Sequence, residues 1–166
     1  MTSQRLATIT ATLDAEKEKI ADELKRSVDA YWAIWRKTNS DIVTKRHKGD
    51  TSRKQGSLAP SVRIRKESDG GAVTVRWRNY SNNYARLNLA NKESLKYAKE
   101  LPRNKSGITD TRALLRVAEK WERELVIEIL NTINPLILEM SAVHEAIKKI
   151  KTVERQLLKT TKAQEA

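Results

Sequence analysis

The feature that most constrains the fold is a regular apolar stripe along the first 39 residues. From Arg5 to about Asn39, apolar residues recur in steps of three, four and seven, and no Pro or Gly occurs before Gly49. This spacing predicts one long amphipathic helix whose apolar face needs a partner helix. The stripe consists of Leu6, Ile9, Leu13, Ile20, Leu24, Val28, Tyr31 and Trp35.

A second stripe near the C-terminus predicts the partner helix. Thr109 or Asp110 can cap it, and its apolar positions continue to about Lys159. Because Pro135 has no backbone N–H, we expect either a kink or a new helix capped by Asn134. The stripe consists of Leu114, Ala118, Trp121, Leu125, Ile129, Ile133, Leu136, Met140, Val143, Ile147, Ile150 and Leu157.

Two short runs in the middle of the chain have the alternation of β-strands. Ser61–Lys66 and Ala72–Tyr80 are rich in β-branched residues and flank the turn sequence Glu67–Gly71, which predicts a β-hairpin. Because side chains alternate across a strand, one face is apolar and the other basic. We expect the apolar face to pack near Trp32 and Trp35. It consists of Val62, Ile64, Val73, Val75 and Trp77, and the opposite face carries Arg63, Arg65, Arg76 and Arg78.

The remaining segments predict loops and one short element. Residues 40–60 lose the helical period and contain Gly49, Gly56 and Pro60, which favours a loop. Lys92–Leu101 is compatible with a short helix that ends before Pro102, and a basic turn follows.

These elements predict a mainly α fold with a small β-hairpin. Long antiparallel helices would form a coiled-coil-like hairpin or bundle, with the basic hairpin and loops at one end. We divide the chain into an N-terminal helix (1–39), a basic loop, hairpin and connector (40–105), and C-terminal helices (106–166) with a kink or break at Asn134-Pro135. The three segments are expected to form one structural unit.

The net charge of +12 resides entirely in the middle segment. Residues 36–105 hold 18 Lys or Arg against 6 Asp or Glu, whereas residues 1–35 and 106–166 have net charges of −1 and +1. Such a concentration favours a polyanionic partner. A solvated basic loop is the alternative.

The composition suggests a cytoplasmic protein. The chain has no Cys, so disulfides and thiolate metal sites are excluded. Residues 1–9 lack the apolar run of a signal peptide. The apolar stretches Leu125–Leu130 and Leu136–Leu138 are short and interrupted, so we expect no membrane span.

The sequence offers little for catalysis. His47 lies among cations, and His144 lies beside an apolar stripe and lacks the spacing of a zinc protease. Glu122 and Glu124 are expected to be a solvated carboxylate pair on a helix of mixed charge. Trp32, Trp35, Trp77 and Trp121 are expected in the core rather than as stacking platforms. We therefore expect no enzyme activity, no cofactor and no metal.

Nucleic-acid binding is the function that the sequence favours. A two-stranded β-ribbon fits the major groove of duplex DNA, and phosphates take at least half of protein–DNA hydrogen bonds. Loop cations would add affinity that depends strongly on salt. The candidate DNA-binding residues are Lys45, Arg46, Lys48, Arg53, Lys54, Arg63, Arg65, Arg76, Arg78, Arg103 and Lys105.

Several short blocks also suggest a family. Tyr31-Trp32-x-x-Trp35-Arg36, then Leu58–Arg65, then Val73–Trp77 resemble the MobI-type accessory mobilisation proteins of integrative and conjugative elements. The resemblance covers roughly residues 31–80. It implies an auxiliary protein that binds DNA at an origin of transfer and helps a separate relaxase to start conjugation.

Two other functions remain open at this point. The helices could form an adaptor that binds a protein partner, or the basic segment could bind RNA. A homodimer through the helices is compatible with the sequence.

Overall fold

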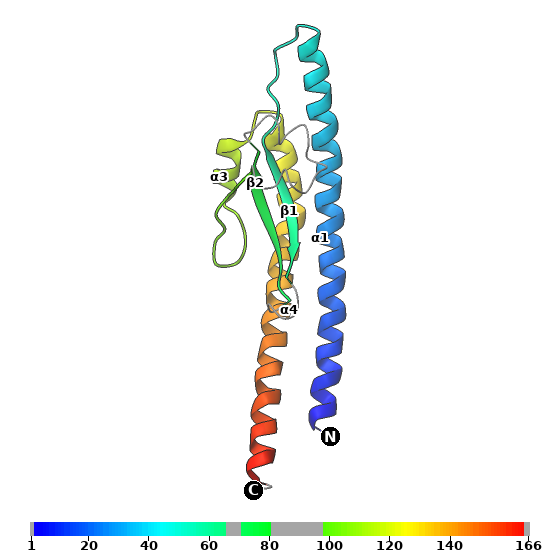
Figure 1. The fold of residues 1–166 in the computed structure, drawn as a ribbon, viewed down its shortest axis with the longest axis vertical. Coiled ribbons are helices and arrows are strands. Elements are labelled where there is room, and N and C mark those ends of the chain that lie inside the picture. Colours follow the sequence, from blue (N-terminus) through cyan, green and yellow to red (C-terminus); the bar gives the residue numbers. More distant parts are fainter. Residues whose placement is uncertain (1, 66–70, 81–97, 165–166) are drawn as a thin grey trace.

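The computed structural model describes residues 2–65, 71–80 and 98–164, and two long helices dominate it (Figure 1). Helix α1 spans Thr2–His47, and helix α4 spans Glu122–Gln164. They run side by side in opposite directions, so that both chain ends lie at the same end of the molecule. The fold is mainly helical with a small antiparallel sheet, as the sequence predicts.

The N-terminal helix continues beyond its predicted end. It was expected to stop near Asn39, but it reaches His47 and ends at a turn in which Gly49 has a φ of +91°. Ile42 is only 4% exposed, and Asn39 is 5% exposed. Packing at these two positions therefore carries the helix through a segment whose sequence has lost its regular apolar period.

The C-terminal helices break at a different place from the expected one. A short helix, α3, spans Thr111–Val117, and Asp110 caps it by accepting a hydrogen bond from the Arg112 backbone N–H. The chain is extended at Ala118, and α4 then runs through Pro135 without ending. Ile133 and Met140, on either side of Pro135, are buried. Packing on both sides keeps the helix continuous despite the lost backbone donor.

Three strands form one antiparallel sheet in the order β1-β2-β3. Strand β1 spans Leu58–Ile64 and pairs with β2, Val73–Asn79, with Val62 opposite Val75. The predicted turn between them lies outside the described residues, except for Gly71. The third strand, β3, spans Lys99–Glu100 and pairs with the end of β2. A helix was predicted over Lys92–Leu101, but its described part, residues 98–101, contains β3 and no helix. Residues 92–97 lie outside the described part.

The core lies where the sheet meets the two long helices. β1 packs beside α1, and β2 contacts α4 (Figure 1). Val75 and Trp77 of the apolar strand face enter this core, Val62 and Val73 pack against it, and Ile64 stays exposed. Of the four tryptophans predicted in the core, Trp35 and Trp77 are buried, whereas Trp32 and Trp121 are partly buried against it. The sheet lies beside the middle and C-terminal half of α1, so the first turns of α1 and the last turns of α4 extend past it. The largest fully buried residues are Trp35, Trp77, Tyr80, Leu24, Leu58, Leu114, Ile133, Glu122, Val75, Val126 and Pro60.

Helix α4 is long and apolar enough, within Glu122–Thr160, to cross a membrane by length and composition. No such stretch was expected from the sequence, because the uninterrupted apolar runs within it are short. Val126, Leu130 and Ile133 of this stretch pack in the core against α1 and the sheet. A core helix of a soluble protein satisfies the same criterion, so the stretch is weak support for a membrane span.

Candidate nucleic-acid interface

The basic segment begins on the last turn of α1 rather than in a loop. Lys45 and Arg46 were expected in a loop, but both belong to the helix and are exposed. Their positive charges lie at the negative end of the helix dipole, which favours the helical conformation there. The helix thus fixes the backbone positions from which these two side chains extend. Lys48, Arg53 and Lys54 follow in the loop and are also exposed.

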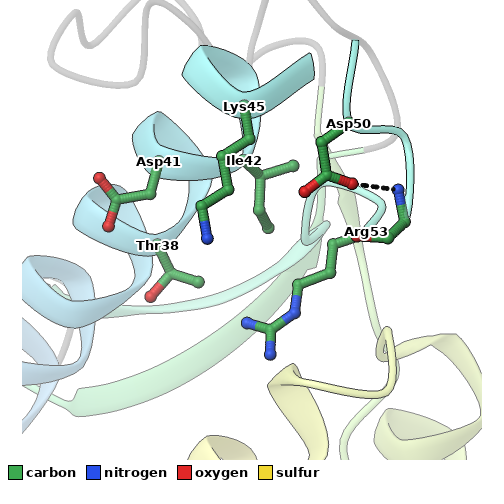
Figure 2. Close-up of a pocket in the computed structure, with 7 residues that line it drawn as sticks. Thr38, Asp41, Ile42, Lys45, Asp50 and Arg53 are labelled. Atoms are coloured by element: carbon green, nitrogen blue, oxygen red, sulfur yellow. Dashed lines mark hydrogen bonds between the residues drawn. The ribbon is translucent and has the colours of Figure 1, made fainter. Parts of the chain in front are cut away.

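Lys45 and Arg53 reach toward one cavity (Figure 2). The cavity has a volume of about 290 Å³ and lies between the end of α1 and the loop, with Thr38 on its wall. The carboxylate of Asp50 accepts a hydrogen bond from the Ser52 backbone N–H at 2.9 Å. A hydrogen bond with the Ser52 side chain, then this backbone bond, and then the charges of Lys45 and Arg53 lower the pKa of Asp50. Asp50 thus shapes the loop and partly offsets the two cations.

Two side chains, one from α1 and one from the turn before α4, hold the loop in place. Asn39 of α1 accepts a hydrogen bond from the Gly56 backbone N–H at 2.8 Å, and it donates one to the Trp35 carbonyl. Trp121, just before α4, donates its indole N–H to the Lys54 carbonyl at 3.0 Å. The cations at 53 and 54 are therefore attached to an anchored backbone.

Glu122 is the centre of this anchor. Its side chain was expected on a solvated face, but the residue is completely buried. Its Oε1 accepts hydrogen bonds from the indole N–H of Trp35 at 2.7 Å and from the Leu58 backbone at 3.0 Å. Its Oε2 accepts one from the Glu119 backbone at 2.9 Å, as in the capping of a helix N-terminus. One carboxylate thus links α1, β1 and α4.

Burial is the main influence on the acidity of this carboxylate. It raises the pKa of Glu122 above the ordinary value of 4.5, and the hydrogen bonds from Trp35 and three backbone amides oppose the shift. Burying a carboxylate is costly unless it is well hydrogen-bonded. The donors around Glu122 supply that compensation.

Gly56 leaves the room that the anchor needs. A Cβ at this position would lie 2.6 Å from Cζ2 of Trp121 and would overlap the Glu122 carboxylate. Real Cβ atoms essentially never approach so closely. The requirement for glycine is therefore steric, because Gly56 is not at a positive φ.

The outer edge of β1 is covered by aromatic residues of α1. The Tyr31 hydroxyl donates a hydrogen bond to the Leu58 carbonyl at 2.8 Å, and the Trp32 indole donates one to the Pro60 carbonyl at 2.7 Å. Pro60 has no N–H to leave unpaired at this edge. The ring of Tyr31 also meets Trp77 edge to face, with centroids 5.6 Å apart. The predicted packing of the strands near Trp32 and Trp35 is confirmed.

The four hairpin arginines are not equivalent. Arg63 and Arg65 are exposed near the tip of the strand pair. Arg76 is only 13% exposed at its side chain and forms an ion pair with Glu100 of β3 at 2.7 Å. The two predicted strands, residues 61–66 and 72–80, contain no acidic residue, and β3, which carries Glu100, was not predicted from the sequence. The main contact of Arg76 is therefore this ion pair within the sheet, and its guanidinium is largely shielded from solvent.

Arg78 is also partly enclosed. Its side chain lies beside Tyr80, where burial raises the pKa of the phenol and the charges of Arg78 and Arg36 oppose that shift. The Nη1 atom of Arg78 is buried and makes no hydrogen bond. A buried guanidinium nitrogen cannot contact a phosphate without a local rearrangement, so Arg78 is not a freely accessible cation.

Arg103 and Lys105 form a separate basic group. Arg103 pairs with Thr109 in an isolated β-bridge, and its Nε lies 4.0 Å from Oε1 of Glu100. Lys105 is exposed, in a turn that includes Gly107 with a φ of +86°. The turn borders a cavity of about 330 Å³ that His144 of α4 also lines. Burial lowers the pKa of His144, and the Lys148 charge acts in the same direction.

The candidate residues therefore fall into separate groups. The loop group, Lys45 to Lys54, lies before β1, and the tip group, Arg63 and Arg65, lies at the end of β1. Strand β1 has seven residues, which at about 3.3 Å each separate the groups by roughly 20 Å. The sequence did not predict the residues that position the loop, which are Glu122, Asn39 and Gly56. The spacing of Glu119 and Glu122 resembles a capping box and is the one signal that points to Glu122.

Among the residues that the structure describes, no group of three or more His, Asp or Glu side chains could hold a metal ion. Comparisons with protein-family models, with curated proteins and with solved structures found no match for this chain.

Proposed function

We propose that this chain is a non-enzymatic, cytoplasmic DNA-binding protein that contacts duplex DNA through its loop and tip groups. One observation carries the proposal. Five exposed cations lie within ten residues, and in the described part of the chain none has an acidic side chain within ion-pair distance. These residues are Lys45, Arg46, Lys48, Arg53 and Lys54.

The arrangement suits phosphate contact better than base recognition. Lys45 and Arg46 are held by a helix, and the backbone of Lys54 is bonded to Trp121. Cations on an ordered backbone lose less conformational freedom on binding than cations on a mobile loop. Phosphate contact gives affinity that depends on salt and little on sequence. Arg63 and Arg65, on the accessible end of the strand pair, are the side chains proposed to reach a groove.

A role beside a relaxase at an origin of transfer is the more specific form of this proposal. It is supported by the resemblance to MobI-type mobilisation proteins in residues 31–80. The blocks that carry the resemblance contact one another, since Tyr31 and Trp32 donate hydrogen bonds to β1 and the ring of Tyr31 packs against Trp77 of β2. The resemblance therefore concerns the scaffold that presents the cations. Coiled-coil packing of α1 and α4, with docking of a transfer protein on them, completes the proposal.

The test is fluorescence anisotropy with labelled duplex DNA, single-stranded DNA and RNA at several salt concentrations. Duplex binding should weaken with salt, and the double variant Arg53→Gln/Lys54→Gln should reduce the slope of log K against log salt by about 0.9 per lost contact. The matched control is Lys25→Gln/Arg26→Gln, which removes two exposed cations from α1 away from the loop.

The outcomes separate the candidate functions. Absence of binding to any nucleic acid at low salt would overturn the proposal and leave the helical adaptor. Tighter binding to RNA than to DNA would replace it with RNA binding. An equal loss in the control pair would show that the charge acts without a defined site.

A further inference from the structure

The lower ends of the two long helices form an arm that extends past the sheet (Figure 1). We define the arm as residues 4–19 of α1 and 148–160 of α4. No residue in either range is buried, whereas the buried residues of the core start at Ile20 in α1 and end at Ile147 in α4. Lys17 lowers the pKa of His144, so the two helices are still adjacent where the arm begins.

The arm nevertheless carries the apolar pattern of a buried helix pair. In α1 the apolar residues Leu6, Ile9 and Leu13 have the spacing i, i+3, i+7, and in α4 Ile150, Val153 and Leu157 repeat it. This spacing places each set on one helix face. Ile9 remains 48% exposed and Val153 remains 40% exposed. The apolar residues between the two helices of the arm therefore form a seam that is incompletely buried.

Two helices alone cannot enclose such a seam, because each can cover only one side of the other. Four helices packed around a common axis do enclose it, and this is the arrangement of a four-helix bundle. A second copy of the arm supplies the two missing helices. The identical surface on both copies then forms a closed two-fold interface.

The charges of the arm favour a particular pairing in that bundle. The α4 part holds five Lys or Arg and one Glu, a net charge of +4, whereas the α1 part holds three of each sign. Two α4 helices side by side would repel each other. Asp14, Glu16 and Glu18 give α1 the acidic groups that a neighbouring basic helix needs. Asp14 and Glu16 are at present paired with Lys17 and Lys19, which are partly exposed and exposed lysines of the same helix.

We propose that the arm is a dimerisation surface for a second copy of this chain. The two arms lie side by side with the two-fold axis along them, so that each α1 lies between both α4 helices. The sheets and basic loops of the two copies then lie at the same end of the dimer. This inference does not rest on DNA binding, because its observations concern residues outside the loop group and the tip group.

Sedimentation velocity tests the surface. The wild-type chain should sediment as a dimer at tens of micromolar, and Ile9→Glu/Val153→Glu should weaken the dimer at least about tenfold. The control is Ile34→Glu/Ile127→Glu, which replaces two isoleucines, 51% and 44% exposed, outside the arm. It should leave the dimer intact, and circular dichroism should show unchanged helicity in both variants.

Three results would overturn the proposal: a wild-type monomer at about 0.1 mM, an arm variant that stays dimeric, or an equal dissociation of the control. A basic apolar helix also suits an anionic lipid surface. If the wild-type chain is monomeric but sediments with phosphatidylserine vesicles, and Val153→Glu abolishes this, the arm is a membrane contact instead.

Cross-linking tests the pairing of the helices. The sequence has no Cys, so each introduced thiol is the only one in its chain. A mixture of the Ile9→Cys and Val153→Cys chains should form disulfide-linked unlike pairs under mild oxidation. Efficient linkage of Val153→Cys chains with one another, in the absence of the other variant, would contradict the arrangement in which α1 separates the two α4 helices.

Discussion

The two ends of the β1–β2 strand pair share the same sequence alternation but differ in environment. At the base, Leu58 is completely buried and Trp77 is 2% exposed. At the tip, Ile64 is 64% exposed although it lies on the same apolar face as Trp77. The arginines show the same difference, since Arg76 is ion-paired to Glu100 and Arg63 is exposed.

The comparison shows how far an alternating pattern can be interpreted. Alternation assigns side chains to one face or the other, because the period of a strand is two. It does not say whether a neighbouring element covers that face. At the base, Tyr31, Trp32 and Glu122 bond to β1 and anchor it, whereas the tip extends beyond these contacts. Similar arginines are therefore structural at one end and accessible at the other.

The largest expected effect tests the anchor at the base. Gly56→Ala should lower the free energy of unfolding by about 3 kcal/mol, because the added methyl overlaps Glu122 and Trp121 in a filled site. Chemical denaturation measures it. Gly49→Ala is the comparison: nothing lies within 4 Å of its Cβ, and only the positive φ opposes it, at about 1 kcal/mol. Equal losses in the two variants would mean that the anchor is not tightly packed.

An intermediate effect concerns the buried carboxylate. Glu122→Gln should cost about 1–2 kcal/mol at pH 4, because the amide places a donor where one oxygen accepted a backbone N–H. The pKa of Glu122 is raised in the folded state, so this group binds a proton more tightly in the folded chain than in the unfolded chain. Its contribution to the free energy of unfolding therefore decreases as pH rises.

The pH dependence of that difference is the measurement. The stability advantage of the wild type over Glu122→Gln should shrink from pH 4 upward, through the range that begins at the ordinary carboxyl pKa of 4.5. Denaturant titrations of both proteins at matched pH values give the difference directly. An advantage that grows with pH would contradict burial as the dominant influence on Glu122.

The smallest expected effect separates the two kinds of arginine. Arg76→Ala should cost about 1 kcal/mol of stability, because it leaves Glu100 without its ion pair. Arg63→Ala should change stability by less than about 0.5 kcal/mol and should weaken duplex DNA binding. Thermal unfolding and anisotropy on the same samples measure both. If Arg76→Ala alone reduced DNA affinity at unchanged stability, the assignment of the two ends would be reversed.

Much of the scaffold was predictable from local patterns. The stripes of α1 and α4, the two antiparallel strands, the cap at Asp110 and the burial of Trp35 and Trp77 all follow from spacing and residue type. The burial of Glu122 did not, because a glutamate beside other charged helix residues is ordinarily solvated. Strand β3 did not either, since two residues carry no periodic signal.

The long amphipathic helices and the strand pair follow from the period of local elements, and the concentration of positive charge between them follows from composition alone. Tertiary packing set where the helices end, which cations are paired and which carboxylate is buried. These outcomes depend on residues far apart in the chain, as when Trp35, Leu58 and Glu122 meet through hydrogen bonds. Local periodicity carries no information about such contacts.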